Sequence, residues 1–158
     1  MQTCTKCAVT PNFHHFEYMG ETSMGVQIFY TRPYPNIETK FTRDTMNNYL
    51  YHLEYTRNYC HDVFPFIWIF DAYGLDKHEI PNPSLMKEFY SIMHSRYKDS
   101  MKKVYILHAN KMVQFVLGVI KLFVKKESYA KIVMVRSAVE LLEEGLAGSI
   151  VKRVFGGN

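Results

Sequence analysis

VYILHANKMVQFVLGVIKLFVKKESYAKIVMV, residues 104–135, is the stretch that decides the fold of this chain. It predicts a buried strand over 104–109, a helix over 111–125, a basic turn, and a second strand over 130–135. A helix that crosses over a parallel sheet normally shows one apolar stripe and a polar back. This helix is apolar nearly all round. One broad face holds Met112, Phe115, Val116, Val119, Ile120 and Phe123, and another holds Val113, Leu117 and Val124. Apolar material is therefore expected to cover both of its sides.

Strands and helices alternate along the rest of the chain. The β-rich run 26–30 precedes a helix that begins near Thr42, and the two-sided apolar run 66–70 precedes a helix capped at Asn82. A capping box at Ser137 opens a helix that ends near Gly145, and a short amphipathic segment follows over 149–155. This order predicts an α/β fold with a mainly parallel, or mixed, sheet of about four to five strands and flanking helices. Residues 1–24 are expected to form a poorly structured lead-in to one domain over 25–158.

Composition narrows the class of partner. The chain is 47% hydrophobic and 15% aromatic, which favours a thick aromatic core or a cavity lined by rings. The net charge of +4 comes from scattered basic residues, so an anionic membrane surface is a better acidic partner than nucleic acid. The apolar run 112–124 falls short of the roughly 20 residues that cross a bilayer. With three cysteines and no secretory signal, we expect a cytoplasmic protein that touches membranes at their periphery.

Catalytic and metal sites find little support in the sequence. Cys4-x-x-Cys7 with His14 and His15 suggests a metal site that Cys60 and His61 could complete, but the spacing is not that of a common zinc motif. A mobile, reduced N-terminus explains these residues better, so no metal and no cofactor are predicted. The chain lacks the GxSxG, GxGxxG and Walker A patterns. Asp71, at the end of a strand, is best explained as the cap of a turn that Gly74 completes, and no catalytic residues are predicted.

Ordered blocks over about residues 25–157 resemble the CRAL-TRIO, or Sec14-like, lipid-binding domain, in its divergent branch found beside Rho GTPase-activating and macro domains. The blocks are FIWIFDAYGL (66–75), VYILHAN (104–110), FVLGVIKLFV (115–124), AKIVMV (130–135) and IVKRVFGGN (150–158). This chain departs from the family in three places. The pair Asn110–Lys111 replaces a proline after the third strand, Leu122 replaces a proline in the gate helix, and nothing before residue 25 resembles the family's helical N-terminal subdomain.

The resemblance implies a pocket between the sheet and the helix 111–125, which would act as a gate. The pocket would hold a phospholipid, such as a phosphoinositide, or another lipophilic molecule, and would exchange it at membranes without covalent chemistry. The candidate pocket residues are Phe115, Val119 and Phe123 from the helix, and Ile67, Ile69, Tyr105 and Leu107 from the strands. The pattern does not say which side of each strand faces the pocket. Lys121, Lys125, Lys126 and Lys131 are the candidates for contact with an anionic bilayer.

A second interpretation stays open at this point. The same chain could be a protein-interaction scaffold with a filled pocket, which binds a small GTPase or a second copy of itself. The apolar helix would then belong to the core or to a homodimer interface. The two hypotheses differ in whether a lipid accompanies the protein.

Overall fold

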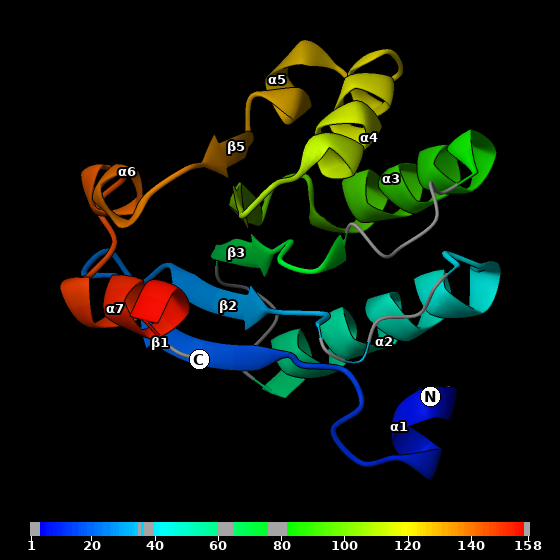
Figure 1. Cartoon of the computed structure of the whole chain (residues 1–158), viewed down its shortest axis with the longest axis horizontal. Coiled ribbons are helices and arrows are strands. Elements are labelled where there is room, and N and C mark those ends of the chain that lie inside the picture. The colour runs from blue at the N-terminus through cyan, green and yellow to red at the C-terminus, as the bar shows by residue number, and fades with distance from the viewer. Residues whose placement is uncertain (1–3, 35, 37–39, 60–64, 76–81, 157–158) are drawn as a thin grey trace.

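The computed structural model describes residues 4–34, 36, 40–59, 65–75 and 82–156. Its centre is a five-stranded sheet in the order β1-β2-β3-β4-β5 (Figure 1). The strands are β1 (Glu17–Glu21), β2 (Gln27–Thr31), β3 (Phe66–Asp71), β4 (Met101–Leu107) and β5 (Ile132–Val135). β1 pairs with β2 in antiparallel fashion, and every other pair is parallel. The prediction of an α/β fold with a mainly parallel, mixed sheet is confirmed.

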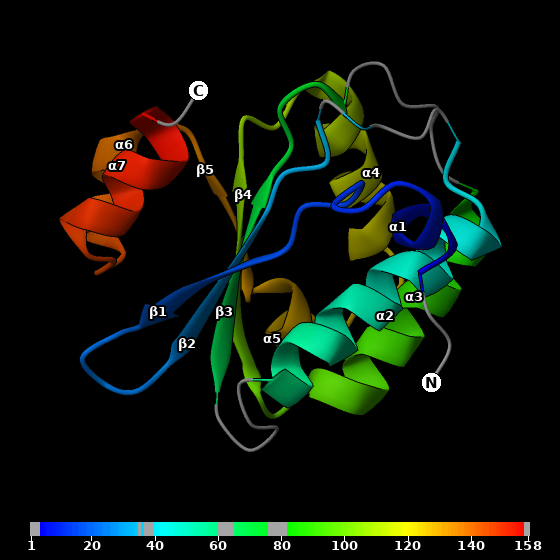
Figure 2. The ribbon, with the colours of Figure 1, turned by 90° about the horizontal axis from the view of Figure 1, so that it is seen from below.

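The helices form two layers, one on each face of the sheet. They are α1 (Thr5–Val9), α2 (Arg43–Tyr59), α3 (Pro83–Tyr97), α4 (Lys111–Lys121), α5 (Lys126–Tyr129), α6 (Ala138–Glu143) and α7 (Gly148–Gly156). From β2 to β5 each strand lies beside the next one in the chain. Because crossovers between parallel strands are right-handed, the helices that connect β2 to β5 all lie on the same face of the sheet. Figure 2 shows α2, α3, α4 and α5 on that face, while α6 and α7 cover the other.

Asparagine and serine side chains set where three of the helices begin. Asn82 accepts a hydrogen bond from the backbone N–H of Ser84 at 2.8 Å and so caps α3, and Ser137 caps α6. At α4 the side chain of Asn110 accepts a hydrogen bond from the N–H of Val113 at 2.9 Å. Asn110 therefore starts this helix by capping its first turn.

Two local expectations were wrong. The apolar helix ends at Lys121 and not at residue 125, and the basic turn after it contains the separate helical turn α5. The lead-in is also more ordered than expected, because α1 and β1 lie within residues 1–24 and β1 is an edge strand of the sheet. An edge strand is half solvated and carries polar residues, so EYMGE lacks the apolar run that marks an interior strand.

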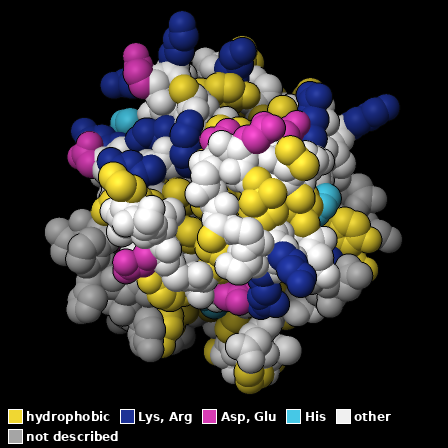
Figure 3. All heavy atoms as spheres, turned by 90° about the vertical axis from the view of Figure 1, so that its left-hand side faces the viewer, with side chains coloured by type: hydrophobic (Ala, Val, Ile, Leu, Met, Phe, Trp, Pro, Cys, Tyr) yellow, Lys and Arg dark blue, Asp and Glu magenta, His cyan; other side chains and the backbone are white. Residues whose placement is uncertain are grey.

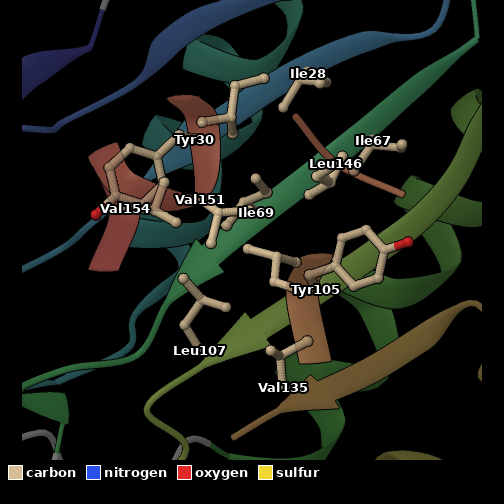
Figure 4. Close-up of a cluster of buried hydrophobic side chains, with 12 residues drawn as sticks. Ile28, Tyr30, Ile67, Ile69, Tyr105, Leu107, Val135, Leu146, Val151 and Val154 are labelled. Carbon is tan, nitrogen blue, oxygen red and sulfur yellow. The ribbon is translucent and has the colours of Figure 1, made fainter. Parts of the chain in front are cut away.

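Both faces of the sheet are buried, and the two cores differ in composition. Toward α6 and α7 the core is mostly aliphatic, as Figure 4 shows for Ile67, Ile69 and Leu107 facing Val151. Toward α2 and α3 the core is aromatic and includes Phe29, Phe66, Trp68 and Tyr97. The outer surface on the α6 and α7 side carries apolar, acidic and basic side chains interspersed (Figure 3). The helices on the aromatic face frame the candidate site.

Candidate functional site: an apolar cavity beneath α3 and α4

A cavity of about 290 Å³ lies between the sheet and the helices α3 and α4. Its volume is close to the lower end of the range for small-molecule sites, about 300–1,000 Å³. Nearly all of its lining side chains are apolar or aromatic. They are Phe41, Tyr49, Trp68, Phe70, Leu75, Met86, Phe89, Tyr90, Met93, Met101, Val104, Ile106, Met112, Val113, Val116, Leu117, Ile120 and Ile132.

The strands form the floor of the cavity with one side of each pleat. Trp68 and Phe70 from β3 and Val104 and Ile106 from β4 line it, because side chains two residues apart on a strand share a face. The register places Trp68 beside Val104 and Phe70 beside Ile106, so these four side chains form a continuous surface. They give the floor an unbroken apolar character.

Helix α4 forms one wall and buries only its inner face. Val113 and Leu117, one turn apart, are buried against Ala72 and Ile106. The outer face of the same helix is apolar yet exposed: Phe115 is 57% exposed, and Leu122, just past the helix end, is 85% exposed. Lys111, Lys121, Lys125 and Lys126 surround this outer face and are all exposed. Helix α4 therefore has apolar side chains both on the cavity and on the surface.

The polar residues of the lining gather where β4 and β5 begin. They are His94 and Lys98 from the end of α3, Ser128 from α5, and Lys131, which directly precedes β5. Lys131 Nζ donates a hydrogen bond to the carbonyl oxygen of Lys98 at 2.6 Å, and Ser128 Oγ lies 3.5 Å from His94 Nδ1. The cavity is thus apolar along its length and polar, with two lysines, at one end.

One buried polar group sits in the apolar part of the lining. Within the described residues, the indole N–H of Trp68 has no hydrogen-bond partner, although the side chain is 7% exposed. Buried polar groups are normally hydrogen-bonded. An acceptor atom of a bound molecule or a water would satisfy this donor. Because Trp68 is the only tryptophan of the chain, it also provides an intrinsic fluorescent reporter at the cavity.

The structure places none of the seven predicted pocket residues in the cavity lining. Ile67, Ile69, Tyr105 and Leu107 face the other way and pack in the aliphatic core against α7 (Figure 4). Burial raises the pKa of Tyr105 to about 12, helped by the charge of Glu144, which accepts its hydroxyl hydrogen bond at 3.2 Å. On each strand the residues that line the cavity are the neighbours of the predicted ones, namely Trp68, Phe70, Val104 and Ile106.

Two of the pocket residues predicted on the helix also lie one position away from those that line the cavity. Phe115 and Val119 lie outside the lining, and their neighbours Val116 and Ile120 take their place. Phe123 follows the end of α4, where its ring meets the ring of Tyr90, with 6.2 Å between the ring centroids. Of the four predicted membrane-facing lysines, Lys121, Lys125 and Lys126 are exposed. Lys131 instead belongs to the polar end of the cavity.

Asp71 anchors a polar cluster at the carboxyl ends of β2, β3 and β4. Its carboxylate accepts hydrogen bonds from the N–H of Tyr73 at 3.0 Å and the hydroxyl of Tyr30 at 3.2 Å, and lies 2.9 Å from His108 Nδ1. Arg32 Nε is 3.9 Å away. Burial and the negative charge of Asp71 raise the pKa of Tyr30, so its hydroxyl stays protonated. The predicted turn cap is confirmed, and the cluster shows a structural role for Asp71.

Two cysteines and two histidines could hold a metal ion. Their ligand atoms, from Cys4, Cys7, His14 and His52, all lie within 4.8 Å of one another. Burial, and to a lesser degree the charge of His14, lowers the pKa of His52 to about 4, so its ring is neutral at physiological pH. His15, the predicted partner, points elsewhere and contacts Glu17 at 3.1 Å. The other predicted partners, Cys60 and His61, lie outside the described residues.

Comparisons with known proteins identify the family of this chain. The model of the CRAL/TRIO domain family matches residues 14–157. The chain is also 30% identical over 63 residues to the Rho GTPase-activating protein gacY of Dictyostelium discoideum. That match spans 40% of this chain and 9% of the relative's length. Among the described helices, none is long and apolar enough to cross a membrane.

Proposed function

This chain belongs to the CRAL/TRIO domain family, and from that premise we propose that it binds one tail of an anionic lipid in the cavity beneath α3 and α4. Binding involves no covalent step. Helix α4 acts as the gate, and exchange takes place at a membrane surface. The observation that carries this proposal is the amphipathic cavity, which is apolar along its length and polar with two lysines at one end.

The apolar part of the cavity supplies the affinity. Each methylene that moves from water into an apolar site contributes about 0.8 kcal/mol. The volume of about 290 Å³ favours a single acyl tail over a two-chain lipid wholly inside the protein. An ester or hydroxyl oxygen on the bound molecule would accept the hydrogen bond that the Trp68 indole offers.

The polar end selects for charge. The Lys131 ammonium donates a hydrogen bond to the Lys98 carbonyl oxygen, which fixes the Lys131 side chain against the backbone of Lys98 at this end of the cavity. A phosphate or carboxylate at this end would gain charge-assisted hydrogen bonds from both ammonium groups and from Ser128. We therefore propose an anionic headgroup, with phosphoinositides as one candidate class.

The outer face of α4 supports docking on a membrane. Exposed apolar side chains ringed by lysines are typical of segments that lie in the interface of an anionic bilayer. Insertion of Phe115 and Leu122 would pull α4 outward, and this movement would open the cavity wall that Val113 and Leu117 close. Docking and gating are thereby coupled through a single helix.

Fluorescence quenching at Trp68 tests the cavity. Lysophosphatidic acid with a brominated tail should quench Trp68, and lysophosphatidylcholine with the same tail should bind more weakly because it lacks the net negative charge. Val116→Phe fills the wall, and since overpacking costs about 1–3 kcal/mol we expect a loss of affinity of about tenfold or more. Phe115→Ser, the matched change one residue away on the outer face, should keep binding of the soluble lipid but weaken flotation with anionic vesicles.

Native mass spectrometry, followed by lipid extraction, gives an independent test. A co-purifying anionic lipid is expected. If the protein carries no lipid and Trp68 is not quenched, the proposal fails.

The match to a Rho GTPase-activating protein supports a second candidate, a scaffold that binds a small GTPase or self-associates. Val139 and Leu142 on α6 are exposed apolar side chains that could serve such contacts. A lipid-free dimer by light scattering, or complex formation with a Rho-type GTPase that Val139→Asp abolishes, would favour this alternative.

A further inference from the structure

Four side chains from three separate segments converge beside α2. Cys4 and Cys7 come from the start of α1, His14 from the turn after it, and His52 from the middle of α2. We propose that these four residues form a zinc site of the Cys₂His₂ type, which fastens the N-terminal segment to α2. This inference does not rest on the proposed lipid binding.

The distances fit one tetrahedral ion. Bond lengths of about 2.3 Å to sulfur and 2.0–2.1 Å to nitrogen put neighbouring ligand atoms about 3.5 Å apart in a tetrahedron. Cys4 Sγ lies 3.3 Å and Cys7 Sγ 3.7 Å from His14 Nδ1, and Cys7 Sγ lies 3.3 Å from His52 Nε2. Since every pair of ligand atoms is within 4.8 Å, a single ion can reach all four after small side-chain shifts.

The local backbone places the ligands. Cys4 is the N-cap of α1, and the backbone N–H of Cys7 points at its sulfur with 3.5 Å between the atoms. The N–H of His14 donates to Cys7 Sγ at 3.4 Å. Asn12, at φ 62°, adopts the left-handed conformation that turns the chain back and brings His14 to the cysteines.

Burial of the cluster suits a structural ion. Cys4 is 2% exposed and His14 is 9% exposed, so two ligands are enclosed, whereas Cys7 and His52 are half-buried and leave a path for the metal. Both cysteines are free thiols, not a disulfide. Helix α1 has five residues and buries none of them. A helix this short is not stable without tertiary contacts. Figure 2 shows it lying against α2, where the ion would supply such a contact.

The test measures metal content directly. The protein is purified under reducing conditions without chelators, and inductively coupled plasma mass spectrometry should find one zinc per chain. Replacement by Co²⁺ should give a thiolate-to-cobalt charge-transfer band and the visible bands of a tetrahedral ion. Cys7→Ser and His52→Ala should lose the zinc. His15→Ala, at the neighbouring histidine outside the cluster, should retain it.

The variant His52→Cys guards against loss of metal through misfolding, because a Cys₃His set also binds zinc. It should keep one zinc per chain and a stronger charge-transfer band. Wild-type protein with zinc far below one per chain and no cobalt band would overturn the proposal. So would a Cys4–Cys7 disulfide in the purified protein, or equal metal loss in His15→Ala and His52→Ala.

Discussion

The buried carboxylate of Asp71 offers the sharpest test of the folded core. Its side chain is 3% exposed, and its carboxylate oxygens lie at hydrogen-bonding distances of 2.9 to 3.2 Å from Tyr30, Tyr73 and His108. Asp71→Ala leaves the Tyr30 hydroxyl and the Tyr73 N–H without their acceptor. Leaving a buried donor without its acceptor costs about 1–3 kcal/mol, and two donors lose theirs, so we expect the free energy of unfolding to fall by about 2–6 kcal/mol.

A double-mutant cycle isolates the bond between Tyr30 and Asp71. Tyr30→Phe keeps the ring in the aliphatic core and removes only the hydroxyl, which donates to a charged acceptor. Hydrogen bonds to charged groups contribute about 1.5–3 kcal/mol. We expect Tyr30→Phe to cost that much in the wild type and close to nothing in Asp71→Ala. The coupling energy should therefore be about 1.5 kcal/mol or more.

Urea unfolding monitored by Trp68 fluorescence and by circular dichroism measures all four proteins. Independent sites add within about 0.3–0.5 kcal/mol. A coupling energy inside that margin would refute the reasoning, because it would mean that the two side chains do not interact in solution. His108→Ala is a useful companion, since it removes the more exposed partner and should cost less than Asp71→Ala.

Two further perturbations follow from the same structure. Gly74→Ala should destabilise the protein by about 1–3 kcal/mol, because Gly74 has φ +82° and a Cβ there would lie 2.5 Å from the Tyr34 side chain. Gly118 lies on α4 with open space around it, so Gly118→Ala should stabilise the protein by about 0.5–1 kcal/mol. Equal effects of the two changes in urea would contradict this account. Burial alone would raise the pKa of Glu17, but the hydrogen bonds and charges of Arg153 and His15 lower it below its usual 4.5. The pair therefore stabilises the fold above about pH 4.5 and loses its effect as pH falls through the lower folded-state pKa. Arg153→Met should therefore reduce the melting temperature slightly at pH 7 and by less at about pH 3. The same reduction at both pH values would speak against an ionic origin.

The order of elements could be predicted because each strand and helix carries its own pattern. The face of each strand that meets the cavity could not. Ile67 and Trp68 are both apolar, since helices cover both faces of the sheet, and two-sided burial removes the alternation that would orient a strand. One signal was available: the three aromatic residues of β3, Phe66, Trp68 and Phe70, share a face, and a face lined by rings is the better candidate for a cavity wall.

The cysteine–histidine cluster could be predicted only in part. Cys4, Cys7 and His14 are close in sequence, but the fourth member is His52, which lies 38 residues beyond His14 in α2. The helical periodicity of α2 indicates only which of its residues are buried. Local spacing cannot show that α2 brings this histidine back to the N-terminus. The edge strand β1 was not predicted for a related reason. Its own residues do not show a strand pattern, and it is ordered by its pairing with β2.

The N-terminal segment also bears on the cavity itself. Phe16 stacks on His52, with ring centroids 5.2 Å apart, and lies 6.2 Å from Trp68 in the cavity floor. His14 similarly meets Tyr49, another lining residue, at 5.6 Å. An ion held by His14 and His52 would therefore fix two rings that support lining residues. A boundary at residue 25 would remove Phe16 and His14 and leave the cavity wall without its backing. The segment that begins at Cys4 thus backs the cavity wall through these aromatic contacts.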